Sequence, residues 1–185
     1  MSKSLLYSED FRSNSRQYLI IDSTALIDAS RQEEFLTLLF EKVNSEDYGC
    51  SFITSPSVVY EFTRYARSRE QLLKLKEILN LLNIVEWNPM KLNDDEREVF
   101  NFIYNLESTR NAKTGPSYTD AQLCLLAYHF REHGVGILTA NHKDFPRSIF
   151  DRNDLITVDV GGELRTQAIY DFNQDKYDKL LDKFL

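Results

Sequence analysis

The chain has 185 residues, of which 42% are apolar and 28% charged, a mixture typical of one globular domain with a substantial core. Its formal net charge of −7 argues against a protein that coats nucleic acid through bulk positive charge, although it leaves an enzyme with a local phosphate site open. No window holds the roughly 18 consecutive apolar residues of a membrane helix, and the polar N-terminus lacks a signal-peptide core, so we expect a cytoplasmic protein without membrane contact.

Short apolar runs alternate with amphipathic segments along the chain. After an N-terminal extension at residues 1–16, the continuous apolar run from Tyr18 into Asp22 predicts a strand buried on both faces. Further strands are expected at residues 50–54, 84–87, 136–140 and 155–160. Helices are expected at residues 31–43, 56–66, 69–82, 93–107, 118–133 and 173–184, with a loop at residues 108–117.

This alternation predicts one α/β domain over residues 17–185, with a mostly parallel sheet and right-handed crossovers. Cys50 and Cys124 lie in apolar surroundings, so we expect two reduced core thiols rather than a disulfide. In such sheets ligands bind outside the carboxyl ends of the strands. Polar residues expected at this edge are therefore the candidates for a functional site.

Four acids from four distant segments are expected at that edge. Asp22 ends the first strand, and Glu61 lies in the helix that follows the second strand. Asp120 lies in the first turn of the helix that leads into the fourth strand, and Asp144 follows that strand, together with Asn141. Carboxylates that converge repel one another, and a cation removes this cost. A cluster of oxygen ligands without cysteine or histidine favours Mg²⁺ or Mn²⁺.

Each acid also has a purely structural interpretation. On this interpretation Asp22 caps the next helix, and Ser23 and Thr24 join a turn. Asp120 is then the acid of a capping box with Ser117. Glu61 pairs with Arg64 or Tyr65 at the surface, and Asp144 closes an Asx-turn before Phe145. The joint placement of all four at one sheet edge favours the metal site.

Four segments, "YLIIDSTALID", "SPSVVYEFTR", "YTDAQLCLLAY" and "ILTANHKDF", together resemble the PIN-domain family of metal-dependent ribonucleases, which includes the VapC-type toxins. The resemblance extends from Tyr18 to Val160. It implies a three-layer sandwich with a five-stranded parallel sheet flanked by helices, Mg²⁺ or Mn²⁺ as cofactor, and endonucleolytic cleavage of RNA. The chain departs from the family at Thr24, where Asn is common, and at Asn141, where an acid is usual, so Asn141 and Asp144 both stay in the ligand set.

The resemblance suggests a role for each residue of the site. Asp22, Asp120 and Asp144, with Asn141 as the alternative fourth ligand, would bind the first metal, and Glu61 would hold a water or a second ion. Ser23, Arg64 and Lys143 are the substrate-binding candidates. Further basic side chains expected around the site are Arg67, Arg110, Lys113 and His142.

Other functions stay open at this point. One is a non-catalytic PIN-fold module that binds protein, and another is the toxin of a toxin–antitoxin pair, with an antitoxin-like partner or a second copy of the chain on an apolar helix face. "HFREH" at His129–His133 matches a zinc-peptidase pattern, but it is expected at the opposite, amino edge of the sheet. "DSTALID" invites a phosphatase interpretation, although Thr24 replaces the second acid of that pattern.

Overall fold

The structure is a computed structural model that describes residues 6–7, 16–31, 35, 50–85, 94–109, 115–160 and 162–184. Side chains are described in these ranges except at residues 6, 7, 94 and 158–160. None of the helices in these ranges combines the length and the apolar character that crossing a membrane requires. Cys50 and Cys124 are buried free thiols, as predicted.

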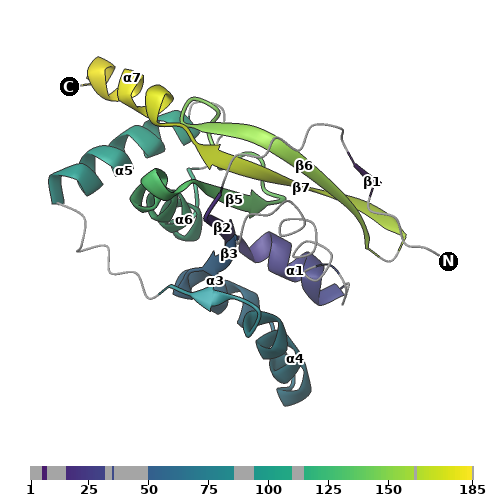
Figure 1. The fold of residues 1–185 in the computed structure, drawn as a ribbon. Coiled ribbons are helices and arrows are strands. Elements are labelled where there is room, and N and C mark those ends of the chain that lie inside the picture. The colour runs from purple at the N-terminus through teal and green to yellow at the C-terminus, as the bar shows by residue number, and fades with distance from the viewer. Residues whose placement is uncertain are drawn as a thin grey trace.

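One mixed sheet organises the fold, with strand order β1-β6-β7-β5-β2-β3-β4 (Figure 1). Its strands are β1 (Leu6–Tyr7), β2 (Tyr18–Ile21), β3 (Ser51–Thr54), β4 (Asn83–Ile84), β5 (Val135–Thr139), β6 (Phe150–Val160) and β7 (Glu163–Phe172). Strands β5, β2, β3 and β4 are parallel to one another. All five residues of β5 are buried, whichever face of the sheet they point to, as expected for a strand covered on both sides. The predicted α/β class is therefore confirmed.

The expectation of a five-stranded, wholly parallel sheet is wrong. The expected fifth strand, residues 155–160, belongs to β6, and β6 runs antiparallel to β7, a strand that the sequence analysis missed. Strand β7 in turn pairs antiparallel with β5. The physical reason is a tight turn: Val160 pairs with Glu163, and Gly162 has φ +93°, which glycine adopts readily. So short a turn joins antiparallel strands, whereas parallel strands need a long crossover.

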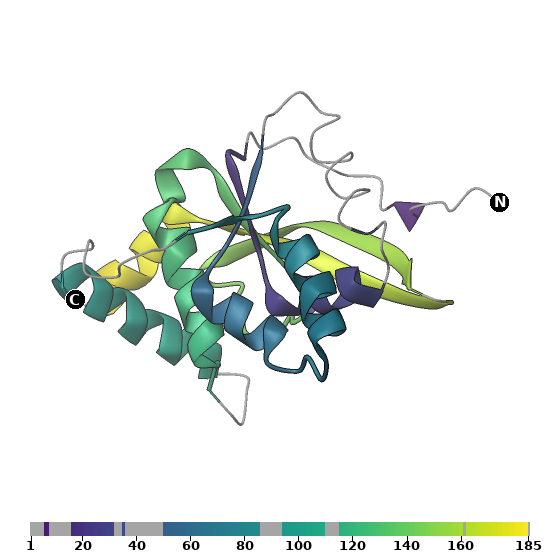
Figure 2. The ribbon, with the colours of Figure 1, turned by 90° about the horizontal axis from the view of Figure 1, so that it is seen from below.

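Two groups of helices surround the parallel strands (Figures 1 and 2). One group holds α1 (Ser23–Arg31), α3 (Pro56–Thr63) and α4 (Arg69–Leu79), and the other holds α5 (Asp94–Thr109), α6 (Tyr118–His129) and α7 (Gln174–Phe184). A 3₁₀ turn, η2 (Arg131–His133), follows α6. Helix α3 begins where Ser55 and Pro56 predict it, and the Ser55 hydroxyl accepts from the Val58 N–H.

Some predicted elements extend beyond the described residues. Most of the helix expected at residues 31–43 lies outside them, although Phe35 is helical and buried. Of the strand expected at residues 84–87, the structure describes Ile84, which ends β4, and Val85.

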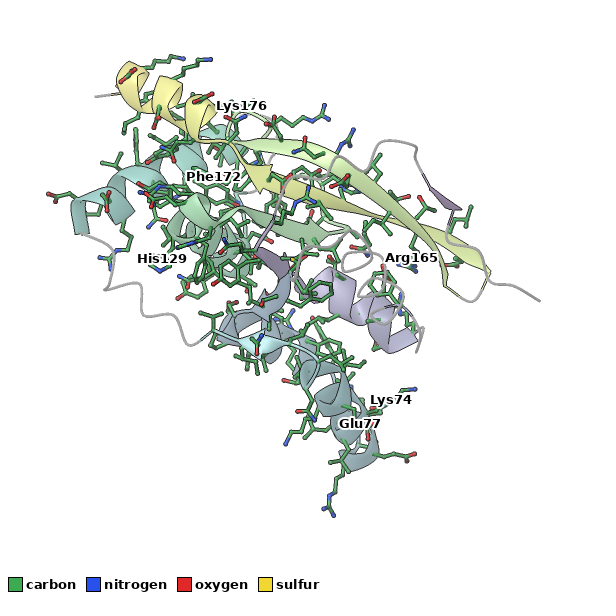
Figure 3. All side chains as sticks on the ribbon, in the orientation of Figure 1. Lys74, Glu77, His129, Arg165, Phe172 and Lys176 are labelled. Atoms are coloured by element: carbon green, nitrogen blue, oxygen red, sulfur yellow. The ribbon has the colours of Figure 1, made fainter. Side chains whose placement is uncertain are left out.

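Aromatic side chains join the second helix group to the end of the β6–β7 hairpin. The ring of Tyr128 lies 4.8 Å from that of Phe100 and 5.2 Å from that of Tyr177, which join α6 to α5 and α7. Phe172, labelled in Figure 3, lies 5.7 Å from both Tyr128 and Tyr177 at the end of β7. The C-terminal helix is thus part of the core.

A buried ion-pair network ties the segment before β2 to the hairpin. The Arg16 guanidinium donates to Asp154 at 2.6 Å and to Asp171 at 2.5 Å, and it is 8% exposed. Gly136 of β5 leaves room for this network, since a Cβ there would lie 2.7 Å from Oδ1 of Asp171. The residue predicted as the last of an N-terminal extension is therefore packed inside the domain.

Helix α1 is also tied to the hairpin, through Asp28. The Asp28 carboxylate accepts a hydrogen bond from the Gln167 amide at 2.6 Å and lies 3.6 Å from the Arg165 guanidinium. Figure 3 shows Arg165 on the side of β7 that faces α1. This contact fixes the helix whose first turn carries the candidate site.

Candidate metal-binding site

The candidate site lies where the connections of the sheet change direction. Strand β2 pairs with β3 on one side and with β5 on the other, so the crossovers leave its neighbourhood in opposite directions. Asp22 follows β2 directly, and its N–H donates to the Leu138 carbonyl of β5 at 3.1 Å. Asn141 and Asp144 follow the end of β5. This is the position at which open α/β sheets bind ligands.

Asp22 is 2% exposed and is held by hydroxyl groups. Its Oδ2 accepts from the Thr24 hydroxyl and from the Thr139 hydroxyl, both at 2.7 Å. Its Oδ1 accepts from the Ser23 N–H at 2.6 Å. These donors fix the orientation of the Asp22 carboxylate.

Glu61 joins three helices through its carboxylate. Its Oε2 accepts from the Ser23 hydroxyl of α1 at 3.0 Å, and its Oε1 accepts from the Thr119 hydroxyl of α6 at 2.6 Å. The surface pairing with Arg64 or Tyr65 is not formed. The predicted convergence of Glu61 with the end of β2 and the start of α6 is thus observed.

Asp120 is buried and closes a capping box with Ser117 at the start of α6. Burial raises the pKa of Asp120 to about 6; hydrogen bonds from Ser117 lower it, and the charges of Asp144 and Asp22 raise it further. The structural interpretation of Asp120 is therefore correct, but it is incomplete. Asp120 therefore lies within electrostatic reach of both Asp22 and Asp144.

The loop after β5 completes this group. The Asn141 amide donates to Oδ2 of Asp144, and the Asn141 N–H donates to the Thr139 hydroxyl at 2.8 Å. The Tyr104 hydroxyl of α5 donates to the Asp144 carbonyl at 2.8 Å, which anchors the loop. Asn141 and Asp144, the two candidates for the fourth ligand, are thus hydrogen-bonded to each other.

No lysine or arginine among the described residues forms an ion pair with Asp22, Glu61, Asp120 or Asp144. In the same ranges, no three histidine, cysteine or acidic side chains are arranged to hold a metal ion by themselves. Mg²⁺ commonly binds through one or two carboxylates and keeps several waters. Carboxylate and amide oxygens are the ligands such an ion prefers, so Asp22, Asp120, Asp144 and Asn141 supply the right kind of donor, with water as the further ligand.

The predicted substrate-binding residues differ in their surroundings. Ser23 is buried between Asp22 and Glu61, whereas Lys143 is exposed. Arg64 is exposed at the end of α3, with its guanidinium 4.6 Å from the Tyr65 ring centre. The ring of His142 lies 3.2 Å from the Tyr170 hydroxyl, and burial, with the charge of Arg152, lowers the pKa of His142. Arg67 is exposed, and Arg110 and Lys113 lie outside the described residues.

Sequence reasoning missed three residues of this site. Thr139 and Thr119 each donate to a carboxylate, and Tyr104 anchors the loop of Asp144. Thr139 is the second-last residue of the strand predicted at residues 136–140, at the edge already singled out, and this position was a usable signal. Thr119 directly precedes Asp120, which is a weaker signal, and nothing in the sequence separates Tyr104 from a core tyrosine.

The zinc-peptidase pattern lies at the opposite edge of the sheet, as predicted. His133 precedes β5, and its ring lies 6.1 Å from that of Tyr18 at the start of β2. His129, labelled in Figure 3, ends α6. Its ring lies 5.0 Å from that of Phe130. Both histidines pack against aromatic rings rather than around a shared ion position.

Comparisons with known proteins name no family. No protein-family model matches the chain, and no curated protein matches it. A crystal structure of TrmN from Thermus thermophilus is similar over 85% of this chain and 44% of that chain, at 10% identity and a TM-score of 0.29. The chain thus spans less than half the length of that structure, and a likeness this distant indicates neither fold nor function. The resemblance to PIN domains stays a prediction.

Proposed function

We propose that this protein is a Mg²⁺- or Mn²⁺-dependent phosphodiesterase that cleaves RNA. The observation that carries the proposal is that Asp22 follows β2, Asp144 follows β5, and the charges of both act on the buried Asp120 carboxylate at the start of α6. Within the described part of the chain no basic side chain neutralises them. Such a group suits a divalent cation and the phosphate that the cation attracts.

Asp22, Asp120 and Asp144, with the Asn141 amide, would hold the ion, and Glu61 would hold a water beside it. A divalent ion in this position would lower the pKa of a bound water and stabilise negative charge on the phosphate. The chain's own hydroxyls have a separate task. Thr24 and Thr139 orient Asp22, while Ser23 and Thr119 orient Glu61, so the acids are positioned before any ligand arrives.

The experiment is cleavage of mixed RNA by the purified chain with and without Mn²⁺, beside the Asp22→Asn variant. We expect cleavage only with Mn²⁺ and a loss of at least about 100-fold in Asp22→Asn, as for removal of a ligand that positions catalytic groups. Glu163→Gln serves as the control, since Glu163 is exposed on the distant hairpin turn. Cleavage by Asp22→Asn at the wild-type rate would overturn the assignment.

One observation favours a second candidate, a non-catalytic module that binds protein. Both oxygens of Asp22 already accept hydrogen bonds from the protein, so this carboxylate is satisfied without an ion. Calorimetric titration with Mn²⁺ before the RNA assay separates the two. Ion binding with cleavage supports the enzyme, and absence of both supports the module.

A further inference from the structure

A hollow lies where α1, α3 and α4 meet. Its volume is about 570 Å³, within the range of about 300–1,000 Å³ that small-molecule sites occupy. Its apolar walls include Ile27 of α1, Phe62 of α3 and Leu75 of α4. Such walls suit a ligand with a flat or apolar body.

The charged residues that line this hollow are basic, although the whole chain carries a net negative charge. The sequence has 29 acidic and 22 basic residues, yet Arg31 and Lys74 line the hollow and none of its described lining residues is acidic. Lys74 extends from α4 near Glu77 (Figure 3), but neither Lys74 nor Arg31 forms an ion pair within the described ranges. A ligand for this hollow should therefore carry negative charge beside its apolar body.

An aromatic ring completes the lining. Tyr65, which follows α3, is 58% exposed and borders the hollow. The Arg64 guanidinium donates to the Tyr65 hydroxyl at 2.6 Å and lies over the ring. An exposed aromatic ring beside a basic side chain is a surface on which nucleobases stack.

Helices α1 and α3 contribute residues both to the candidate metal site and to the hollow. Ser23, Ile27 and Arg31 recur at four-residue intervals, so they share one face of α1. The first of them bonds Glu61, and the other two line the hollow. On α3, Phe62 follows Glu61 in sequence and also lines it. Ile27 therefore lies about one helical turn, roughly 5.4 Å along α1, from Ser23.

We propose that this hollow binds one nucleotide of the RNA next to the cleaved bond, with the base between the apolar walls and Tyr65 and a phosphate at Arg31 and Lys74. This inference rests on the proposed function, since it assigns part of the substrate to a place beside the same site. An amphiphile with a carboxylate head would also match apolar walls and two cations. The two helices that the hollow shares with the candidate metal site favour the nucleotide.

The test follows the methyl NMR signals of Ile27 and Leu75 in the full-length chain, in EDTA, during addition of AMP, CMP, GMP, UMP, the four nucleosides or decanoate. We expect at least one mononucleotide to shift these signals and to bind at least about threefold more tightly than its nucleoside. If no mononucleotide shifts them, or if decanoate does and no mononucleotide does, the inference is overturned.

Paired variants locate the contacts. Tyr65→Leu should weaken mononucleotide binding about tenfold and Tyr65→Phe should preserve it, because stacking depends on the ring. Lys74→Gln should weaken binding about threefold, whereas Lys76→Gln, two residues along the same exposed helix, should not. Equal effects of the two lysine variants would contradict the inference.

Because this binding is measured without a divalent ion, its outcome is independent of cleavage. Mononucleotide binding in a chain that never cleaves RNA would overturn the proposed function and leave the nucleotide site. RNA cleavage by a chain whose hollow binds no mononucleotide would overturn the nucleotide site alone.

Discussion

The hydroxyl of Thr139, at the end of β5, donates a 2.7 Å hydrogen bond to Oδ2 of Asp22, at the end of β2. The two residues are 117 positions apart in the chain, and the parallel pairing of β2 with β5 brings them together. The same hydroxyl accepts from the Asn141 N–H, so it connects the first candidate ligand to the loop that carries the last one. The site is thus positioned by the ends of the two central strands.

Thr139→Val should lower Mn²⁺ affinity about tenfold, because a group that orients a metal ligand is lost. It should also lower the free energy of unfolding by about 1–2 kcal/mol, since the Asn141 N–H loses its acceptor. Thr54→Val is the matched control: Thr54 is equally buried at the end of β3 and donates to the Ile21 carbonyl at 2.8 Å. Urea unfolding should show a similar loss of stability in both variants. Calorimetry should show a Mn²⁺ affinity that is unchanged in Thr54→Val and lower in Thr139→Val. Equal Mn²⁺ affinities of the two variants would count against the role of Thr139.

Ser117→Ala should destabilise the chain by about 1 kcal/mol, the usual cost of a lost helix cap. It should also raise the pKa of Asp120 above about 6, because the Ser117 hydrogen bonds stabilise the charged carboxylate. Carboxyl ¹³C NMR measures this pKa. Ser68→Ala removes the corresponding cap of α4 and should leave the pKa of Asp120 unchanged. A pKa that stays constant in Ser117→Ala would contradict the prediction.

The charge of Asp120 should destabilise the fold in the absence of metal. Its pKa of about 6 in the folded state exceeds its ordinary value of 3.8, so the folded state binds the proton more tightly than the unfolded state. The contribution of Asp120 to the free energy of unfolding therefore falls as pH rises from about 4 to about 6, and it stays low above that range. Asp120→Asn should remove this fall.

The measurement is urea unfolding across this pH range in EDTA, as the difference between wild type and Asp120→Asn. Asp151→Asn is the control, since hydrogen bonds from Lys176 and Asn173, acting against burial, lower the pKa of Asp151. The Asp151 carboxylate stabilises the fold fully above the ordinary carboxyl pKa. The difference in unfolding free energy between wild type and Asp151→Asn should therefore stay flat above about pH 5. If the difference in unfolding free energy between wild type and Asp120→Asn stays flat over this range, the pKa of Asp120 is not raised in the folded state, and the prediction is contradicted.

Arg16→Met should cost about 3–5 kcal/mol of stability, because Asp154 and Asp171 would then be left without the guanidinium that neutralises them. Lys176→Met breaks the 2.5 Å pair with Asp151, whose partners are 36% and 37% exposed, and should cost at most about 1 kcal/mol. Thermal or urea unfolding of both variants checks the contrast. Equal losses would mean that the Arg16 network is no stronger than a surface pair.

The sequence predicted the parallel half of the fold because its signals are local. Continuous apolar runs mark β2, β3 and β5, and Ser55-Pro56 and Ser117 mark helix starts by their capping chemistry. The antiparallel half was missed because β7 contains charged residues in its outer part and because pairing with β6 is set by the turn at Gly162. No local pattern fixes the partner of such a strand.

The candidate site, like the fold, was predicted only in part. The rule that ligands bind at the carboxyl ends of strands brought Asp22, Asp120 and Asp144 to one edge, and in the structure Asp120 lies within electrostatic reach of the other two. The hydroxyls of Thr119 and Thr139 could not be assigned beforehand, because a threonine beside a carboxylate looks the same in sequence as a threonine in any strand or cap. Their role depends on contacts between residues 58 and 117 positions apart.

Calorimetric titration of Mn²⁺ into the EDTA-treated, dialysed chain and into Asp22→Asn tests most directly whether the convergent carboxylates hold a divalent ion. We predict saturable Mn²⁺ binding by the wild type and a Mn²⁺ affinity at least about tenfold lower in Asp22→Asn. Equal affinity in both chains, or no binding by the wild type, would contradict this prediction.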